Sequence, residues 1–353
     1  MGIFGWITKL RNHAFDRQWV GFKTKTFPQV KSICVGNLSV GGTGKTPMVV
    51  CLTRRFLSQG KTVVVISLGY KRRKLGSFFA TAADNATTVG DEPAMYLEEF
   101  NRELGDKFFV YLCKQRAEGV AEVLKRKPQT DVILFDDGYQ HRYVRAGKNI
   151  LLTAYYKPFF QDRLLPYGRL REHPEGARRA DLVVMTKCPA DLSEADRRRL
   201  SEQCASYAHH QPFFSTVDYR EVVSRKQRWQ PDVFWQSCDR RVILVTGIAS
   251  ARPLVDYLKR VNVEVLKHFD FADHHRFTMA ELREVEKFYF AEKEKAAAAG
   301  LTPPGLITTQ KDYVRLLVRK DRQLRELPWH YISIMPKILF GQEEAFLKMI
   351  EED

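Results

Sequence analysis

The stretch Val35-Gly36-Asn37-Leu38-Ser39-Val40-Gly41-Gly42-Thr43-Gly44-Lys45-Thr46-Pro47 is typical of a loop that binds phosphate groups. An apolar run at residues 30–35 precedes it and predicts a strand, and Pro47 suits the first turn of a following helix. Gly41, Gly42 and Gly44 allow backbone angles closed to other residues, so successive N–H groups can point at phosphate oxygens. The pattern therefore predicts a protein that binds a nucleoside triphosphate.

The end of this loop supplies the side chains that such a ligand needs. Lys45 is expected to reach the β- and γ-phosphates, and the hydroxyl of Thr46 is expected to bind Mg²⁺. One position departs from the strict motif, which begins with Gly where this chain has Ser39. The flanking strand and helix still favour a phosphate loop over an incidental glycine-rich turn.

Length and composition set the outer bounds of the prediction. A chain of 353 residues exceeds a usual single core, so two domains of about 150 residues each are expected. Hydrophobic content of 44% argues against a disordered chain, and six scattered cysteines without CxxC spacing indicate reduced thiols of a cytosolic protein. The cysteines do not predict a zinc site, and only the adjacent His274 and His275 keep that alternative open. The net charge of +15 predicts an anionic partner: nucleic acid, a phospholipid surface or a phosphorylated substrate.

The first residues predict a basic amphipathic helix. Its apolar side chains recur every three or four positions, and the charged residues between them are almost all basic. The apolar runs are too short to span a bilayer, and no cleavage site follows them. The helix therefore either docks on a membrane surface or packs on its own domain. Its apolar positions are Ile3, Phe4, Ile7, Leu10, Ala14, Phe15, Trp19 and Phe22.

Strand and helix patterns alternate along the rest of the chain, which predicts an α/β fold with a mostly parallel sheet. A first, nucleotide-binding domain is expected at residues 1–150 and a second, smaller α/β domain at 151–353, with the last residues, 329–353, assigned to either. An irregular stretch at 155–180 indicates a long functional loop or a linker. Strands are expected at 62–67, 108–112, 132–135, 150–153, 182–186, 213–217, 242–246, 263–268 and 306–308, and helices at 46–59, 92–103, 116–126, 193–208, 253–261 and 278–299.

Acidic residues at strand and helix ends supply the other half of the phosphate chemistry. Asp136 and Asp137 follow the apolar run 132–135, at the edge of a parallel sheet where ligands bind, and either could hold Mg²⁺. Asp91 and Glu92 form a second pair at the start of a helix. A kinase that acts on an alcohol needs a group that accepts the hydroxyl proton, and Asp91 is a candidate for this role.

Together these residues resemble the tetraacyldisaccharide 4′-kinase family, which acts in lipid A biosynthesis. The resemblance covers residues 1–315, and the motifs occur in the order typical of the family. They are residues 36–47, Val89-Gly90-Asp91-Glu92, Asp136-Asp137-Gly138-Tyr139-Gln140-His141-Arg142, Leu165-Pro166-Tyr167-Gly168-Arg169-Leu170-Arg171-Glu172, Asp273-His274-His275 and Thr309-Gln310-Lys311-Asp312. Two of them depart from the common pattern: Leu68 stands where members have Arg in Ser-Arg-Gly-Tyr, and Gln310 where they have Glu.

The resemblance implies a P-loop kinase with the active site in the cleft between two α/β domains. ATP and Mg²⁺ would be its cofactors, and an acylated disaccharide 1-phosphate its substrate, phosphorylated at the 4′-hydroxyl to give lipid IV-A. It implies a monomer at the cytoplasmic face of the bacterial inner membrane, held there by the basic first helix, with no nucleic acid partner.

The resemblance also implies a role for each site residue. Asp91 would be the base and His274 or His275 would polarise it. Lys45, with Gly41, Gly42, Thr43 and Gly44, would bind phosphates. Arg171, together with Arg116 and Arg142, would clamp phosphate oxygens. The metal ligands would be Thr46, Glu92, Asp136 and Asp137.

Two other classes of protein fit parts of the sequence. A regulatory or metallochaperone GTPase has a similar phosphate loop, and Thr186-Lys187 or Lys311-Asp312 resemble a guanine-binding motif. A nucleic-acid-binding ATPase fits the net charge, but the basic residues lack interleaved aromatics.

Overall fold

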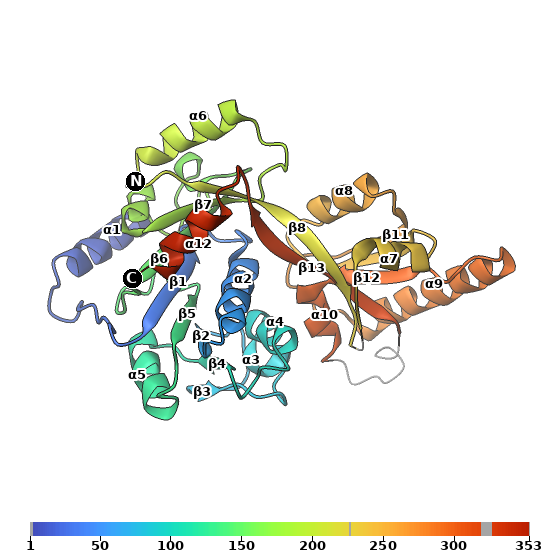
Figure 1. Ribbon diagram of the computed structural model, residues 1–353, viewed down its shortest axis with the longest axis horizontal. Coiled ribbons are helices and arrows are strands. Elements are labelled where there is room, and N and C mark those ends of the chain that lie inside the picture. Colours follow the sequence, from blue (N-terminus) through green and yellow to red (C-terminus); the bar gives the residue numbers. More distant parts are fainter. Residues whose placement is uncertain (1–2, 226, 319–326, 353) are drawn as a thin grey trace.

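The computed structural model describes residues 3–225, 227–318 and 327–352 (Figure 1). Its thirteen described strands join one sheet. In chain order the elements are α1 (Ile3–Asp16), β1 (Lys31–Asn37), α2 (Lys45–Ser58), β2 (Val63–Ser67), β3 (Phe78–Phe79), α3 (Ala86–Val89), α4 (Asp91–Glu99), β4 (Phe108–Leu112), α5 (Arg116–Arg126), β5 (Val132–Asp136), β6 (Lys148–Ala154), the 3₁₀ helices η1 (Phe159–Gln161) and η2 (Pro174–Arg179), β7 (Leu182–Thr186), α6 (Glu194–Ala205), β8 (Phe213–Val223), β9 (Arg228–Trp229), α7 (Pro231–Ser237), β10 (Arg241–Thr246), α8 (Arg252–Arg260), β11 (Glu264–Asp270), α9 (Met279–Ala298), β12 (Gly305–Thr309), α10 (Gln310–Leu316), β13 (Trp329–Ile338) and α12 (Glu343–Glu351).

The first half of the sheet is parallel and centred on β1, which pairs with β5 on one side and β6 on the other. Both faces of β1 are buried, since Ile33 and Val35 enter one hydrophobic cluster and Cys34 enters another. Helices α2, α4 and α12 cover the first face, and α5 and α6 contribute to the second. A strand buried on both faces and followed by a helix is the arrangement that places ligands at its carboxyl end.

Two long antiparallel strands, β8 and β13, join this half to the second (Figure 1). The beginning of β8 pairs with β7 of the first half, and β13 pairs with β12 of the second. Strands β12, β10 and β11 continue the sheet in parallel. Helices α9 and α10 pack on one face of this half, and α7 and α8 pack on the other. The α/β fold class expected from the sequence is thus confirmed.

The expected domain boundary at residue 150 falls inside β6, which lies between β1 and β7 in the first half of the sheet. Because β6 and β7 pair with the first half, we propose that the two domains meet in β8 and β13 instead. After β13 the chain returns to the first half, where Phe346 and Ile350 of α12 are buried against β1 and its neighbours. This return was one of the two alternatives that the sequence left open.

Most expected elements are present within one to three residues of their predicted ends, but three kinds of difference stand out. Helix α4 ends at Glu99, because Phe100 leaves the helical conformation and packs on Phe108. Strand β8 continues to Val223, since its second part pairs with β13. The short helices α3, α7 and α10 were not predicted, because one or two turns carry too little periodicity.

Candidate functional site

The phosphate loop joins the carboxyl end of β1 to the first turn of α2. Gly44 lies just before the helix with φ of 87°, in the left-handed region that favours glycine. The Asn37 amide donates a hydrogen bond to Thr43 Oγ1 (2.7 Å), and the N–H of Val40 donates to the carbonyl of Arg169 (2.7 Å). The loop is therefore held from both sides, with its N–H groups near the start of α2.

Asp137, at the end of β5, is the acidic partner of the loop. Its carboxylate accepts two hydrogen bonds from Arg171 (3.0 and 2.7 Å), and Oδ1 lies 3.8 Å from Lys45 Nζ. Burial alone would raise the pKa of Asp137, but Lys45 and Arg171 together lower it to about 2. This side chain therefore stays ionised at neutral pH.

Asp136, the residue before it, has the opposite electrostatic environment. Burial, with the nearby carboxylates of Glu92 and Asp137, raises the pKa of Asp136 to about 7. Its Oδ2 accepts a hydrogen bond from Ser67 Oγ (3.2 Å). A bound cation would reduce the repulsion between this buried carboxylate and the two beside it.

These carboxylates fit Mg²⁺ in the form typical of nucleotide sites. Within the described ranges, no three His, Cys, Asp or Glu side chains are grouped so as to hold a metal by themselves. Mg²⁺ commonly takes only one or two carboxylates and completes its shell with water and substrate phosphates. Asp136, Asp137 and Glu92 lie near one another, and Thr46 is in the first turn of α2. The residues present therefore suit a metal that arrives with a nucleotide.

The three arginines expected to clamp phosphate lie in different surroundings. Arg171 is beside the phosphate loop, where it binds Asp137 and also the side chain of Asn37. Arg116 is buried and donates to the backbone carbonyls of Asp136 and Asp137 (2.8 and 3.0 Å), which holds the end of β5 in place. Arg142 binds the carboxylate of Asp16 and the carbonyl of Asn12, both in α1. Only Arg171 is thus placed next to the phosphate loop.

Asp91 begins α4 and meets residues of the second half of the molecule. Its Oδ2 lies 3.2 Å from His274 Nδ1, and it accepts hydrogen bonds from Arg315 Nε (3.0 Å) and Nη2 (2.5 Å). Burial raises the pKa of Asp91, but the hydrogen bonds and charge of Arg315 outweigh it, so the pKa lies below its ordinary value. Gly90 precedes it at φ of 95°, where a Cβ would lie 2.8 Å from the carbonyl oxygen of Tyr70.

The side chains of the two neighbouring histidines point in different directions. His274 points to Asp91, and its Nε2 lies 3.2 Å from Lys311 Nζ. His275 instead bonds to Glu281 Oε2 (2.8 Å) at the start of α9 and stacks on Phe271. The structure therefore brings His274, and not His275, to Asp91.

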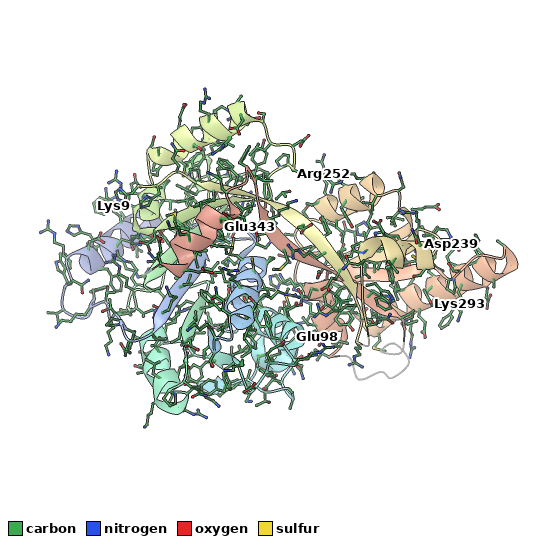
Figure 2. All side chains as sticks on the ribbon, viewed as in Figure 1. Lys9, Glu98, Asp239, Arg252, Lys293 and Glu343 are labelled. Carbon is green, nitrogen blue, oxygen red and sulfur yellow. The ribbon has the colours of Figure 1, made fainter. Side chains whose placement is uncertain are left out.

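Helix α1 has one face packed on the first half and another exposed. Phe15 is fully buried against Phe22 and Tyr143, whereas Trp6, Ile7 and Leu10 are 66%, 60% and 57% exposed. Basic side chains such as Lys9 extend outward from the same helix (Figure 2). The side chains of Ile3 and Phe4 lie outside those that the structure describes. No described helix is long and apolar enough to cross a membrane.

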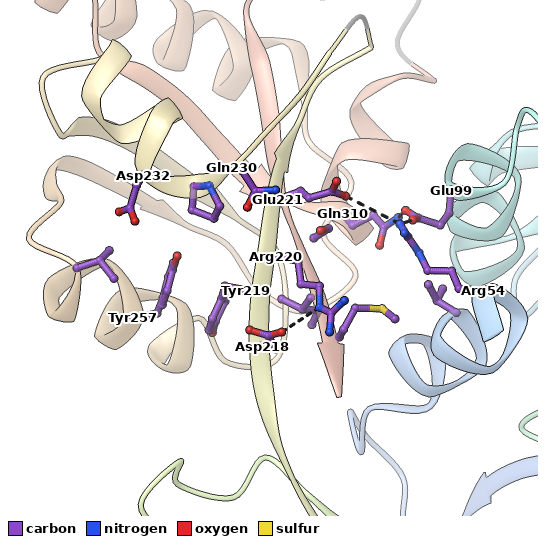
Figure 3. Close-up of a pocket in the computed structure, with 16 residues that line it drawn as sticks. Arg54, Glu99, Asp218, Tyr219, Arg220, Glu221, Gln230, Asp232, Tyr257 and Gln310 are labelled. Atoms are coloured by element: carbon purple, nitrogen blue, oxygen red, sulfur yellow. Dashed lines mark hydrogen bonds and ion pairs between the residues drawn. The ribbon is translucent and has the colours of Figure 1, made fainter. Parts of the chain in front are cut away.

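A cavity next to β8 and β13 has none of the predicted site residues in its lining. It has a volume of about 560 Å³ and is lined by charged side chains that pair with one another (Figure 3). Arg54 binds Glu99, and Arg220 binds Asp218. Because these charged groups already pair with one another, we place the functional site at the phosphate loop and Asp91 instead.

Several residues that shape the site were not predicted from the sequence. Arg315 is separated from Asp91 by 224 positions, and only the packing of α10 on α4 brings them together. Asn37 lies within the phosphate-loop motif, but its contacts with Thr43 and Arg171 depend on the fold. Glu172 anchors Asn12, Gln140 and Arg179. Glu172 is the last residue of the motif at 165–172, and this position was the sequence signal that could have pointed to it.

Comparisons of sequence and of structure both find similarity to one family of known proteins. A family model described as tetraacyldisaccharide-1-P 4′-kinase (LpxK) matches residues 1–353. The tetraacyldisaccharide 4′-kinase of Flavobacterium johnsoniae is 37% identical, over 99% of this chain and 95% of its own. That of Cytophaga hutchinsonii is 35% identical, over 99% of this chain and 92% of its own.

A solved structure shares the fold over almost the whole length. It is the "apo" form of LpxK from Aquifex aeolicus, in complex with ATP. The TM-score is 0.71 at 26% sequence identity, and the match covers 99% of this chain and 95% of that chain. The likeness therefore includes both halves of the molecule.

Proposed function

The chain belongs to the tetraacyldisaccharide 4′-kinase family, and from this premise we propose how its residues carry out the reaction. It is a kinase of lipid A biosynthesis that uses ATP to phosphorylate the 4′-hydroxyl of tetraacyldisaccharide 1-phosphate, giving lipid IV-A. This activity replaces the two alternatives, a regulatory GTPase and a nucleic-acid-binding ATPase.

Asp91 accepts the proton of the 4′-hydroxyl in this proposal. The observation that carries it is the meeting of Asp91 and His274 across the two halves, beside Glu92, whose charge acts on Asp136 at the end of β5. An ionised carboxylate at this place can orient the hydroxyl and remove its proton as the oxygen attacks phosphorus. His274 holds the carboxylate from the second half.

The phosphate loop binds and orients the donor. Gly41, Gly42, Thr43 and Gly44 present N–H groups at the N-terminus of α2, where the helix dipole favours negative charge. Lys45 and Arg171 flank Asp137 and add two positive charges beside the loop. An arginine fork suits two phosphate oxygens at once.

Thr46, Glu92, Asp136 and Asp137 would hold Mg²⁺. When bound, the metal neutralises charge on the phosphate oxygens during transfer. The three carboxylates and one hydroxyl are oxygen ligands of the kind that Mg²⁺ prefers. The raised pKa of Asp136, caused by burial and by its acidic neighbours, supports a cation at this place.

Helix α1 would dock the enzyme on the cytoplasmic face of the inner membrane, where its lipid substrate lies. Trp6, Ile7 and Leu10 expose an apolar stripe, and the surrounding basic residues suit anionic headgroups. We expect a peripheral monomer.

The test is the transfer of labelled γ-phosphate from Mg·ATP to a tetraacylated disaccharide 1-phosphate in phospholipid–detergent micelles. Wild type is compared with Lys45→Ala and Asp91→Ala. We expect a bis-phosphorylated lipid from wild type, and a loss of roughly 10²- to 10⁴-fold in kcat for Asp91→Ala. Arg199→Ala, which removes an exposed ion pair on α6, is the control and should leave the rate unchanged.

Binding of ATP to each variant separates the two roles. Asp91→Ala should bind ATP as tightly as wild type, whereas Lys45→Ala should bind it more weakly. A variant Asp91→Ala that keeps its kcat would remove Asp91 from the role of base.

A further inference from the structure

The hydrogen bonds that the described residues make to the Asp91 carboxylate all reach one oxygen, Oδ2. Arg315 Nε and Nη2 lie 3.0 and 2.5 Å from Oδ2, and His274 Nδ1 lies 3.2 Å from the same atom. For Oδ1 the described part of the chain provides no hydrogen-bond donor. A carboxylate oxygen accepts through two lone pairs, so Oδ2 is fully engaged while Oδ1 is available.

Arg315 is itself fixed before it meets Asp91. Its Nη1 donates to Asp312 Oδ1 (2.9 Å) and to the carbonyl of Gly247 (3.0 Å). Asp312 is fully buried, and its Oδ2 accepts from the N–H of Gly247 (2.9 Å) and from Thr309 Oγ1 (2.7 Å). The Arg315 side chain is only 9% exposed. The guanidinium is thus held by α10 and by the loop after β10, both in the second half.

His274 completes this arrangement from a second segment. Its Nε2 faces Lys311 Nζ at 3.2 Å, and a lysine ammonium can only donate a hydrogen bond. The Nδ1 of His274 lies 3.2 Å from both Asp91 Oδ2 and Arg315 Nη2, so the ring lies against the ion pair that these two residues form. Arginine and histidine thus hold the same oxygen from two directions.

We propose that Arg315 is a positioning residue, which fixes Oδ2 of Asp91 from the second half and leaves Oδ1 to receive the substrate proton. This inference rests on the proposed role of Asp91 as base. In the transfer, the hydroxyl proton moves to Oδ1 as the hydroxyl oxygen bonds to the γ-phosphorus. The bond from that phosphorus to the bridging oxygen breaks, and its electron pair leaves with ADP.

A guanidinium suits this role better than an ammonium because it is planar and has five donors in a fixed fork. Arg315 uses Nε and Nη2 for Asp91 and Nη1 for Asp312 and Gly247, so one side chain links the base to a buried anchor. A lysine at this position has a single nitrogen and cannot reach both sets of acceptors. Replacement by lysine therefore keeps the charge but loses the orientation.

The experiment measures kcat and KM for phosphate transfer by the full chain with Arg315→Ala, Arg315→Lys and the control Arg199→Ala. A misplaced catalytic group costs about 10²-fold in rate. We expect kcat to fall about 10²-fold in Arg315→Ala and at least about tenfold in Arg315→Lys, with KM for ATP unchanged in both. The control removes a guanidinium from an exposed ion pair on α6 and should behave as wild type.

Chemical rescue separates positioning from a structural effect. Free guanidinium added to Arg315→Ala should recover at least about a tenth of the lost kcat, whereas it should do nothing for Asp91→Ala. The inference is overturned if Arg315→Lys has wild-type kcat, if Arg315→Ala does, or if guanidinium fails to raise kcat in a folded Arg315→Ala enzyme. Should Arg315→Ala not fold, the kcat of Arg315→Lys decides alone. Full activity of Asp91→Ala would instead overturn the proposed base, and so distinguishes the two failures.

Discussion

Two adjacent carboxylates at the end of β5 show how strongly a single residue's surroundings govern its chemistry. Asp136 and Asp137 share a turn, yet the pKa of the first is raised to about 7 and that of the second is lowered to about 2. Burial acts on both, but Asp137 contacts Lys45 and Arg171, whereas Asp136 faces Glu92. The ionised Asp137 anchors the cations of the phosphate loop, and both carboxylates belong to the proposed Mg²⁺ ligands.

We predict that Asp136→Asn raises the concentration of Mg²⁺ that the enzyme needs. The concentration of Mg²⁺ needed for half-maximal rate should rise by roughly 10- to 100-fold, because a neutral amide is a poorer ligand for a hard cation. The measurement is the rate of transfer against Mg²⁺ concentration at saturating ATP. Asp256→Asn on α8 is the matched control, since it removes a carboxylate from an exposed pair with Arg252. An unchanged Mg²⁺ requirement in Asp136→Asn would argue against a metal at this position.

The sequence predicts the site only where a local motif carries it. Lys45, Thr46, Asp136, Asp137 and Asp91 lie in short patterns that are readable one segment at a time. The contact of Asp91 with Arg315 joins residues 224 positions apart and has no local pattern. The sequence also cannot distinguish His274 from His275, because only the φ of 60° at His274 and the pairing of His275 with Glu281 separate their directions.

At the scale of the element, helix α1 packs on its own domain and also keeps an apolar stripe exposed, which is what the proposed membrane docking needs. Its second half packs on the first domain, where Arg11 donates to the Gln140 carbonyl and Phe15 is buried. Its first half exposes Trp6, Ile7 and Leu10. A helix that is fixed at one side and apolar at the other suits a membrane surface better than a helix free in solution.

We predict that Trp6→Glu and Leu10→Glu each weaken binding to anionic phospholipid vesicles by at least about tenfold, since each removes an apolar side chain and adds a repelled charge. Vesicle flotation measures the bound fraction. Val233→Glu on α7 is the matched control, because Val233 is also exposed (56%) but lies in the second half. Vesicle binding that is equally strong in all variants would place the membrane contact elsewhere.

The surroundings of His330 in β13 lead us to predict that the second half loses stability as the pH falls. Burial lowers the pKa of His330 from 6.5 to about 4, with the ring packed against Phe234 and Trp229. Between these pH values the unfolded chain binds a proton that the folded chain does not, so stability falls as pH decreases from 6.5 towards 4. At pH 5 the loss from this residue is about 2 kcal/mol.

We predict that His330→Phe removes this loss while keeping an aromatic ring in place. Relative to wild type, the variant should gain about 2 kcal/mol in free energy of unfolding when pH is lowered from 8 to 5. Denaturant unfolding at the two pH values measures the difference. His210→Gln, at an exposed position, is the control and should show no such gain. An identical pH dependence in His330→Phe and wild type would show that the ring is already protonated in the folded state.

At the scale of the whole molecule, the sequence predicts two α/β units but not how they are joined. Strand order is a tertiary property: β8 pairs with β7 in one half and with β13 towards the other, and neither pairing is visible in the pattern of a single strand. The antiparallel pair lets one sheet run through both halves. The contacts that then align the halves lie at the two ends of α4 and α10.

Glu99 is the contact at the end of α4 opposite Asp91. Its side chain is only 2% exposed, and it binds Arg54 of α2 within the first half. From the second half, Gln310 Nε2 donates to Oε2 (3.0 Å), and Arg228 Nη1 lies 3.7 Å from Oε1 (Figure 3 shows Glu99, Arg54 and Gln310). Because Gln310 and Arg315 are both on α10, Glu99 and Asp91 fix the same helix at two points.

We therefore predict that Glu99→Ala loosens the junction between the halves. Removing the buried carboxylate leaves Arg54 and Gln310 without their shared acceptor, which costs about 1 to 2 kcal/mol because Arg54 is partly exposed and Arg228 keeps its ion pair with Glu221. Amide hydrogen exchange should become faster in α4 and α10, while β1 and β5 keep their protection because their hydrogen bonds lie inside the first half. The kcat should also fall, because the contact of Arg315 with Asp91 is then no longer supported by the contact of Gln310 with Glu99. Glu118→Ala, an exposed position on α5, is the control. If exchange in α10 stays at the wild-type rate, the two halves are aligned by β8 and β13 alone.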